Sequence, residues 1–350
     1  MTLKAPFVWF GGKRRVAAEV WTALGDVDNY VEPFAGSLAV LLGRPHDLLD
    51  GQRRAETVND ADGFLANFWR ALAHDPEAVA MWCDWPVNEV DLFARHLWLV
   101  NTGRSRLLEG MESDPDFYDA QIAGWWVWGV NAWIGSGWCS GEGPWIHGDD
   151  GIGKRPHLGD AGQGVNRQLP HLGDAGQGVN RQLPHLGDAG RAGYNNMEHR
   201  PNVLGYFEQL AGRLRDVRVC CGDWSRVVTN GALSFGSTVG VFLDPPYLGD
   251  VRYADLYAVD DHTISHEVRD WCLANGDNPR YRIVLAGYSD EHDELIPDTW
   301  KRYRYSASAA YSTTASAARQ DGNHANRKSE VLWMSPHCLT PDQGTLWETL

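Results

Sequence analysis

Short apolar segments that each end in a polar or glycine-containing turn constrain the possible folds of this chain most. In the first 75 residues they lie at 29–31 and 56–58, and helical patterns follow them, from Leu38 and over 61–73. The same pattern, an apolar segment followed by a polar or glycine-containing turn, recurs later at VRVCC, VGVFL and RIVLAGYS. Alternating strands and helices favour a parallel sheet with crossover helices. Ligands of such sheets bind at the carboxyl ends of the strands.

The central part of the chain, from about residue 80 to 215, has a different pattern. Many of the 17 tryptophans lie in one glycine-punctuated stretch, GWWVWGVNAWIGSGWCSGEGPW. We predict that most of the tryptophans within 125–145 form the core of an insert, while a minority stack on bases or wedge into a duplex.

A tandem repeat follows the tryptophan-rich stretch. The unit PHLGDAGQGVNRQL occupies 156–169 and 170–183, and a third copy starts at Pro184 and diverges after Gly190. We interpret the copies as a tandem duplication. They are either a surface loop that tolerated the added length or a segment that contacts nucleic acid.

Composition narrows the class of protein. The chain has 350 residues, 43% of them hydrophobic, which suits one large domain with an insertion or two modest domains. No apolar run reaches the roughly 20 residues that a bilayer requires, and the N-terminus is unlike a secretory signal, so we expect a cytoplasmic protein that is not bound to a membrane. The six cysteines form no C-x-x-C pair, so neither disulfides nor a metal are expected.

The net charge of -15 argues against a protein that coats nucleic acid nonspecifically. It leaves room for a local basic face, because residues 151–200 contain six cations and four anions.

The segment Val241–Tyr247, VFLDPPY, runs an apolar strand into a carboxylate, two prolines and an aromatic ring. The prolines fix the backbone direction, so a carbonyl and the Asp244 carboxylate can accept the two hydrogens of one amino group, while Tyr247 stacks on a flat heterocycle. Accepting both hydrogens returns electron density to a delocalised amine and stabilises the positive charge that develops when nitrogen attacks an electrophile. The segment therefore predicts a pocket for the exocyclic amine of a base.

Several short motifs, in order, resemble the Dam-type, alpha-group N6-adenine-specific DNA methyltransferases, which use S-adenosylmethionine. They are Trp9-Phe10-Gly11-Gly12-Lys13, Glu32-Pro33-Phe34-Ala35-Gly36-Ser37, Asn59-Asp60 followed by Leu65 and Asn67-Phe68-Trp69, Gly222-Asp223-Trp224, and Asp244-Pro245-Pro246-Tyr247. The resemblance covers about residues 5–75 and 215–335. It implies an α/β fold with a Rossmann-like methyltransferase mixed sheet, helices on both faces, and an inserted target-recognition region.

The resemblance also implies a role for each motif. The tetrapeptide Asp244, Pro245, Pro246 and Tyr247 is expected to be catalytic. The expected cofactor-binding residues are Trp9, Gly12 and Lys13, with Lys13 near the cofactor carboxylate; Glu32, Phe34, Ala35, Gly36 and Ser37 at the methionine moiety; Asp60 at the ribose hydroxyls; Asp223 and Trp224 at the adenine; and Asp244. An alternative role for Asp60 is to cap the helix that follows it.

We accordingly predict a catalytic domain formed by 1–79 and 216–350, and a target-recognition insert at 80–215 that contains the repeats at 156–190. The expected function is site-specific methylation of a flipped adenine in double-stranded DNA, in a restriction-modification, orphan or viral setting, by a monomer or weak dimer. Two alternatives stay open: a catalytically silent DNA-binding protein, and methylation of a different amine, on cytosine N4, RNA or a protein glutamine. One departure from the family pattern is Leu38, which stands where a second glycine is usual, and for which we expect a slightly displaced loop.

Overall fold

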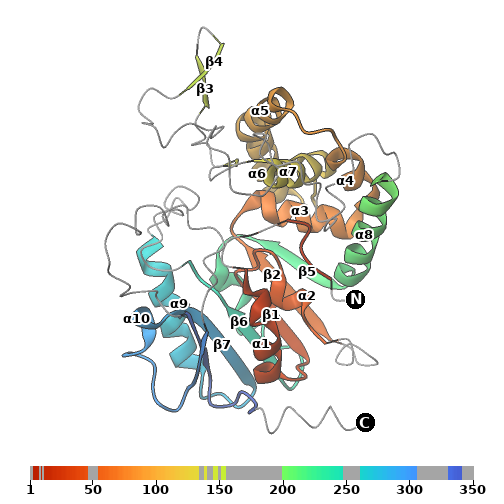
Figure 1. Ribbon diagram of the computed structural model, residues 1–350. Coiled ribbons are helices and arrows are strands. Elements are labelled where there is room, and N and C mark those ends of the chain that lie inside the picture. Colours follow the sequence, from red (N-terminus) through yellow and green to blue (C-terminus); the bar gives the residue numbers. More distant parts are fainter. Residues whose placement is uncertain are drawn as a thin grey trace.

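The computed structural model describes residues 3–7, 9, 12–45, 54–133, 138–139, 145–148, 151–154, 199–246, 261–305 and 330–340 (Figure 1). A seven-stranded sheet with the order β5-β2-β1-β6-β7-β9-β8 organises these residues. The strands are β1 (Asn29–Glu32), β2 (Ala55–Asp60), β5 (Val217–Cys221), β6 (Val239–Leu243), β7 (Tyr281–Tyr288), β8 (Lys301–Tyr305) and β9 (Glu330–Met334). The first five are parallel, whereas β9 is antiparallel to both β7 and β8. A separate antiparallel pair consists of β3 (Trp145–Gly148) and β4 (Gly151–Lys154).

Helices connect and flank these strands. The α-helices are α1 (Ala17–Leu24), α2 (Ala39–Leu42), α3 (Gly63–His74), α4 (Pro76–Cys83), α5 (Glu89–Trp98), α6 (Arg104–Ser113), α7 (Ala120–Ala132), α8 (His199–Leu214), α9 (Asp261–Asn275) and α10 (Ser289–His292). Shorter helical turns are η1 (Lys13–Arg15), the π-helical η3 (Leu99–Gly103) and η7 (Trp224–Val227).

The predicted Rossmann-like methyltransferase mixed sheet is confirmed. Every segment predicted as a strand is one, and the pattern at 61–73 corresponds to α3. The helical pattern from Leu38 gives a single turn, α2, because Gly43 and Arg44 end it. The sheet is mixed because the chain returns through β8 and inserts β9 between β7 and β8.

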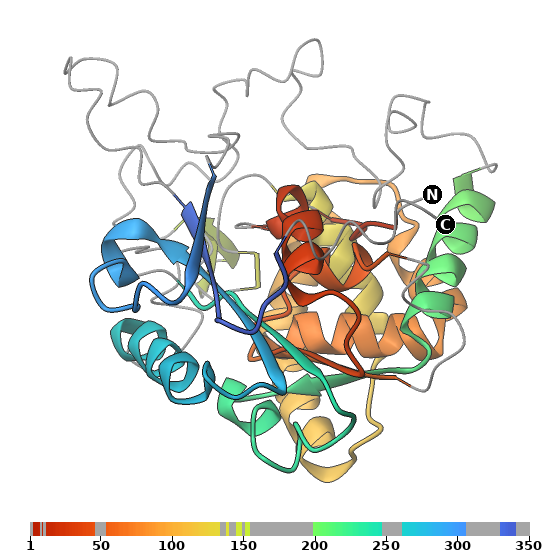
Figure 2. The ribbon, with the colours of Figure 1, turned by 90° about the horizontal axis from the view of Figure 1, so that it is seen from below.

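The two faces of the sheet bury two different hydrophobic clusters. Consecutive strand residues alternate between them: Phe242 belongs to the cluster with α1, α2 and α3, whereas Val241 and Leu243 belong to the cluster with η7 and α9. Side chains of a strand point alternately to opposite faces, so a strand buried throughout needs a cover on each side. Figure 2 shows the red α1 and the cyan α9 on opposite sides of the sheet, as predicted.

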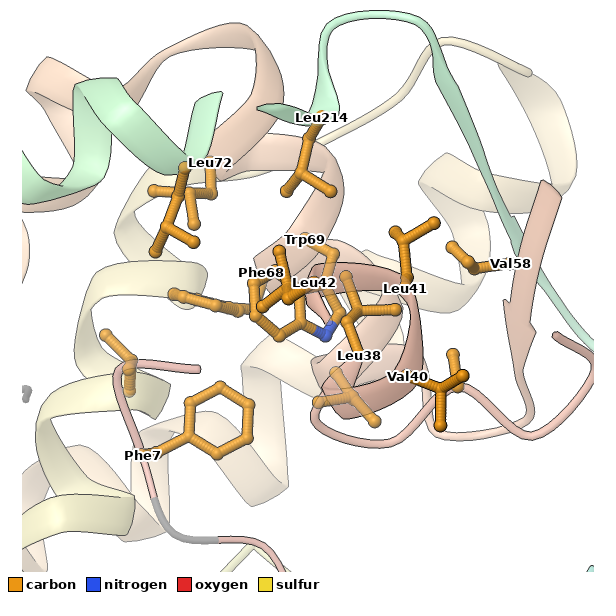
Figure 3. Packing of buried hydrophobic residues seen from close by; sticks show 14 of the residues in the cluster. Phe7, Leu38, Val40, Leu41, Leu42, Val58, Phe68, Trp69, Leu72 and Leu214 are labelled. Carbon is orange, nitrogen blue, oxygen red and sulfur yellow. The ribbon is translucent and has the colours of Figure 1, made fainter. Parts of the chain in front are cut away.

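The helices between α3 and β5 pack on the first of these clusters rather than apart from it. Trp126 and Trp128 of α7 are fully buried, and Phe207 of α8 joins them beside Phe68. Figure 3 shows Phe7, Phe68, Trp69 and Leu214 in the same packing. The tryptophans within 125–145 that the structure describes with side chains are buried or packed against the core, as predicted for most of them. That core is continuous with the one beneath the sheet and is not a separate core of an insert. The domain boundaries stay a prediction, and the repeats at 156–190 lie outside the described residues.

A buried ion network ties α8 to the sheet. Arg213 of α8 donates hydrogen bonds to Glu56 at 2.6 and 2.9 Å, and Arg44 donates to the same carboxylate at 2.8 Å. These partners hold the pKa of Glu56 below its usual value although burial works against them. The last helix before β5 is thereby fixed to the start of β2.

Candidate functional site

The carboxyl ends of the parallel strands bring the predicted site residues to one edge of the sheet. Glu32 ends β1, Asp60 ends β2, Asp223 follows β5 by two residues, and Asp244 directly follows β6. The chain moves outward from β1 through β2 to β5, and then continues at β6 on the other side of β1. The strand order therefore reverses between β1 and β6, which is where ligands bind in open α/β sheets.

Gly36, in the turn after β1, is constrained by hydrogen bonds to its amide and its carbonyl and by the nearby ring of Trp9. Its amide donates to Asp60 Oδ2 at 2.9 Å, its carbonyl accepts from Trp69 Nε1 at 3.0 Å, and its φ is 47°. A Cβ at this position would lie 3.0 Å from two atoms of the Trp9 ring. Only glycine takes this backbone without strain while allowing the ring so close. The turn, which belongs to the second predicted motif, thus contacts the third motif at Asp60 and Trp69 and the first motif at Trp9.

Leu38 has a left-handed backbone, with φ 54° and ψ 28°, where the family pattern has glycine. Its amide donates to the Ala35 carbonyl at 2.8 Å, and its side chain is fully buried among Leu41, Trp69 and other core residues (Figure 3). A left-handed leucine costs about 1–2 kcal/mol. Burial of the same side chain stabilises by about 1.5–3 kcal/mol, which offsets that cost. Whether the loop is displaced relative to the family stays a prediction.

The capping residue of α3 is Asp62, so the alternative role for Asp60 as a helix cap is wrong. Asp62 Oδ1 accepts from the amides of Phe64 and Leu65, at 2.8 and 3.3 Å. Asp60 accepts from the amide of Asp62 at 2.9 Å and from that of Gly36. Burial raises the pKa of Asp60 to about 6, while the backbone amides of Asp62, Gly36 and Ala61 lower it. A carboxylate has about four acceptor sites, so these three amides leave room for a further donor.

Asn59, within β2, connects the turns that follow β1 and β5. Its side-chain amide donates to the Pro33 carbonyl at 3.0 Å and to the Gly222 carbonyl at 2.9 Å. Beside it, Phe34 and Trp224 stack at 6.1 Å between ring centroids. Asp223 is exposed and accepts from the Ser225 amide at 2.9 Å. Trp224 is buried in the core, so the half-buried Phe34 ring that it supports, beside the exposed Asp223 carboxylate, is the surface that suits a flat heterocycle with donor groups.

Lys13 and Asp244 form an ion pair at the end of β6. The distance from Lys13 Nζ to Asp244 Oδ1 is 3.1 Å, and Glu330 Oε2 lies 3.7 Å from the same nitrogen. The Lys13 ammonium is buried, whereas the Asp244 side chain stays 19% exposed. The Asp244 carboxylate, directly after β6, is thus a partly accessible hydrogen-bond acceptor beside a fixed positive charge. Pro245 is buried and Pro246 half-buried, while Tyr247 lies outside the described residues.

Glu32 is buried beneath the site. Its Oε2 accepts from the Tyr30 hydroxyl at 2.9 Å and from the Leu41 amide at 3.3 Å. Burial raises the pKa of Glu32 to about 8, and the negative charge of Asp244 adds to the shift. Glu32 is therefore mostly protonated at neutral pH.

Of the other predicted residues, Gly12 is exposed, Ala35 is buried and Ser37 is half-buried, all beside the same turn. Sequence reasoning did not assign site-edge contacts to Tyr30, Trp69 or Glu330. Trp69 carried a signal, since it ends the third motif. Glu330 carried none, because it lies far along the chain in a strand placed by sheet order.

Within the residues that the structure describes, two features are absent: a metal-binding group and a membrane-spanning helix. No group of three or more His, Cys, Asp and Glu side chains is placed to hold a metal ion. Of the helices in the described part of the chain, none has both the length and the apolar character to cross a membrane.

Comparison with known families bears on the N-terminal part of the chain. Residues 9–84 match the model of the D12 class N6 adenine-specific DNA methyltransferase family. The predicted family resemblance is confirmed. The match contains the turn at Gly36 and the Asp60 carboxylate, and it supports DNA adenine methylation as the general activity of this methyltransferase-like chain. No curated protein sequence matches the chain.

Proposed function

We propose that the protein transfers a methyl group from S-adenosylmethionine to the N6 amine of an adenine extruded from double-stranded DNA. The observation that carries the proposal is the position of Asp244, which follows β6 at the strand-order reversal and keeps part of its carboxylate accessible. The family match at residues 9–84 supports the same chemistry.

The strand-end residues fit the cofactor in chemical type. Asp60 has acceptor capacity for ribose hydroxyls, the half-buried Phe34 ring, supported by Trp224, suits an adenine, and Asp223 adds an exposed acceptor. Trp9, whose ring lies against Gly36, would complete the site, and Lys13 is held beside it by Asp244 and Glu330. When bound, S-adenosylmethionine supplies an electrophilic methyl group on sulfur. The protein's part is to hold the acceptor amine in line with it.

Asp244 would accept an N–H of the amine and stabilise the positive charge that grows on nitrogen. An adenine inside a duplex cannot reach a protein site, and its extrusion costs a few kcal/mol. Hydrogen bonds to a charged group contribute about 1.5–3 kcal/mol each, and stacking of a base on an aromatic ring about 1–3 kcal/mol. These terms are large enough to offset extrusion.

The test is methyl transfer to unmethylated DNA, with the modified nucleosides identified by mass spectrometry. We expect N6-methyladenine from the unaltered protein and at least about a 100-fold loss of rate in Asp244→Ala. Cofactor binding, measured by titration calorimetry, survives in that variant at least partly. Asp270→Asn, which alters an exposed carboxylate of α9, is the matched control and keeps its rate.

Each alternative has its own outcome. Retained turnover in Asp244→Ala would contradict the assigned role. N4-methylcytosine as the product would move the proposal to a different amine. DNA binding without cofactor binding by the unaltered protein would favour a catalytically silent DNA-binding protein.

A further inference from the structure

The buried Lys13 ammonium lies between two carboxylates, and the family motifs account for one of them. We propose that Glu330 is a positioning residue for methyl transfer: it offsets the charge of Lys13, so that Asp244 keeps a net negative charge toward the acceptor amine. This inference rests on the proposed function and deepens it, because it assigns a role to a residue outside every motif.

The sheet order places Glu330 at the site. Glu330 is the first residue of β9 and pairs with Tyr288, the last residue of β7. Because β9 runs antiparallel to β7, its amino end lies at the carboxyl edge of the parallel strands. Strand β7 in turn neighbours β6, which Asp244 follows. A carboxylate distant in sequence from Asp244 thereby reaches the same ammonium.

The two carboxylates are placed to share the ammonium charge. The distances from Lys13 Nζ are 3.1 Å to Asp244 and 3.7 Å to Glu330, and the Glu330 side chain is 10% exposed. Solvent therefore screens the pairs less than it would on the surface. With Glu330 ionised, these three groups together carry one negative charge. Without the charge of Glu330, Lys13 and Asp244 together are neutral.

That remaining charge matters for the reaction. As the N–CH3 bond forms and the S–CH3 bond breaks, the bonding pair leaves with sulfur and the nitrogen becomes positively charged. Asp244 accepts one N–H of this nitrogen and then its proton. If Lys13 binds Asp244 more strongly, it competes with the amine for the same carboxylate. Glu330 weakens that competition by attracting Lys13.

Among the described residues, charged or titratable groups near Asp244 come from different elements. Lys13 belongs to η1, Glu330 to β9 and Glu32 to β1. Glu32 adds no charge near Asp244 while it is protonated. Replacing Glu330 by glutamine removes one negative charge near Asp244. The ionised form of Asp244 is then favoured down to lower pH.

The experiment compares Glu330→Gln with Glu330→Asp in the full-length protein. We expect Glu330→Gln to lower kcat about tenfold, within the 10–100-fold range seen when partners of metal-site residues are removed. The cofactor Kd should stay within about twofold, and the acidic limb of the kcat profile should move to lower pH. Glu330→Asp keeps the charge and should restore most of kcat. The control is Glu291→Gln, which alters another buried carboxylate; Glu291 accepts a hydrogen bond from the Tyr288 amide.

The proposal is overturned if Glu330→Gln, shown to be folded by circular dichroism, keeps both kcat and the acidic limb of the unaltered protein. It is also overturned if Glu330→Asp is impaired as much as Glu330→Gln, since shape rather than charge would then matter. Absence of methyl transfer by the unaltered protein would refute the proposed function instead. The charge coupling would still be decided by carbon-13 titration of the Asp244 carboxyl, whose midpoint must fall in Glu330→Gln.

Discussion

Replacing the buried Glu32 by glutamine should abolish the loss of stability that the protein shows between pH 6.5 and 8. In the folded protein the pKa of Glu32 is raised from 4.5 to about 8, chiefly by burial. The folded state thus binds more protons than the unfolded state in this range. The free energy of unfolding contributed by Glu32 is fully present below about pH 4.5 and falls as pH rises toward 8.

The magnitude follows from linkage. One pH unit within the interval changes the free energy of unfolding by about 1.4 kcal/mol per proton. Between pH 6.5 and 8 the expected loss is on the order of 1–2 kcal/mol. The other shifted carboxylate at this edge, Asp60, has a pKa of about 6 and contributes below this window. His96 and His292, whose pKa values burial lowers from 6.5 to about 4, act in the opposite direction and mainly below this window: their contribution to stability rises with pH and levels off just above pH 6.5.

Urea unfolding at pH 6.5, 7.2 and 8 measures the effect. The unaltered protein should lose stability across the series, whereas Glu32→Gln should show no loss, with a small rise near pH 6.5 from His96 and His292. Glu267→Gln, at an exposed carboxylate of α9, is the control and should keep the slope of the unaltered protein. An equal slope in Glu32→Gln and the unaltered protein would refute the reasoning, because the proton uptake would then belong to another group.

Two further substitutions test the packing around the site. Gly36→Ala should destabilise by about 1–3 kcal/mol and weaken S-adenosylmethionine binding in calorimetry, since the φ of 47° is unfavourable to alanine and the new Cβ would lie 3.0 Å from Trp9. Gly212→Ala, in α8 with nothing near the added carbon, should not destabilise; equal losses would contradict the contact argument. Arg213→Met should cost about 3 kcal/mol in urea unfolding, because it breaks a buried pair with Glu56, and a loss no larger than that of the exposed Arg215→Met would refute it.

The sequence by itself determined the strands, their polar ends and the motifs of the site. Apolar runs such as VGVFL specify buried strands through local pattern, and the residue after each run is necessarily at a strand end. The family resemblance then indicated that Asp60 and Asp244 belong to one site. Both inferences depend on neighbours in sequence, which is why they could be drawn without coordinates.

Only the tertiary structure decided which distant groups share an environment. Asp60 and Asp62 are only two residues apart, and which of them caps α3 depends on where the backbone of that helix begins. The left-handed Leu38 depends on a core that accepts its side chain. Glu330 reaches Lys13 because β9 inserts beside β7 in antiparallel direction. Electrostatic partners act through space, so strand order, and not sequence separation, determines the charge around Asp244.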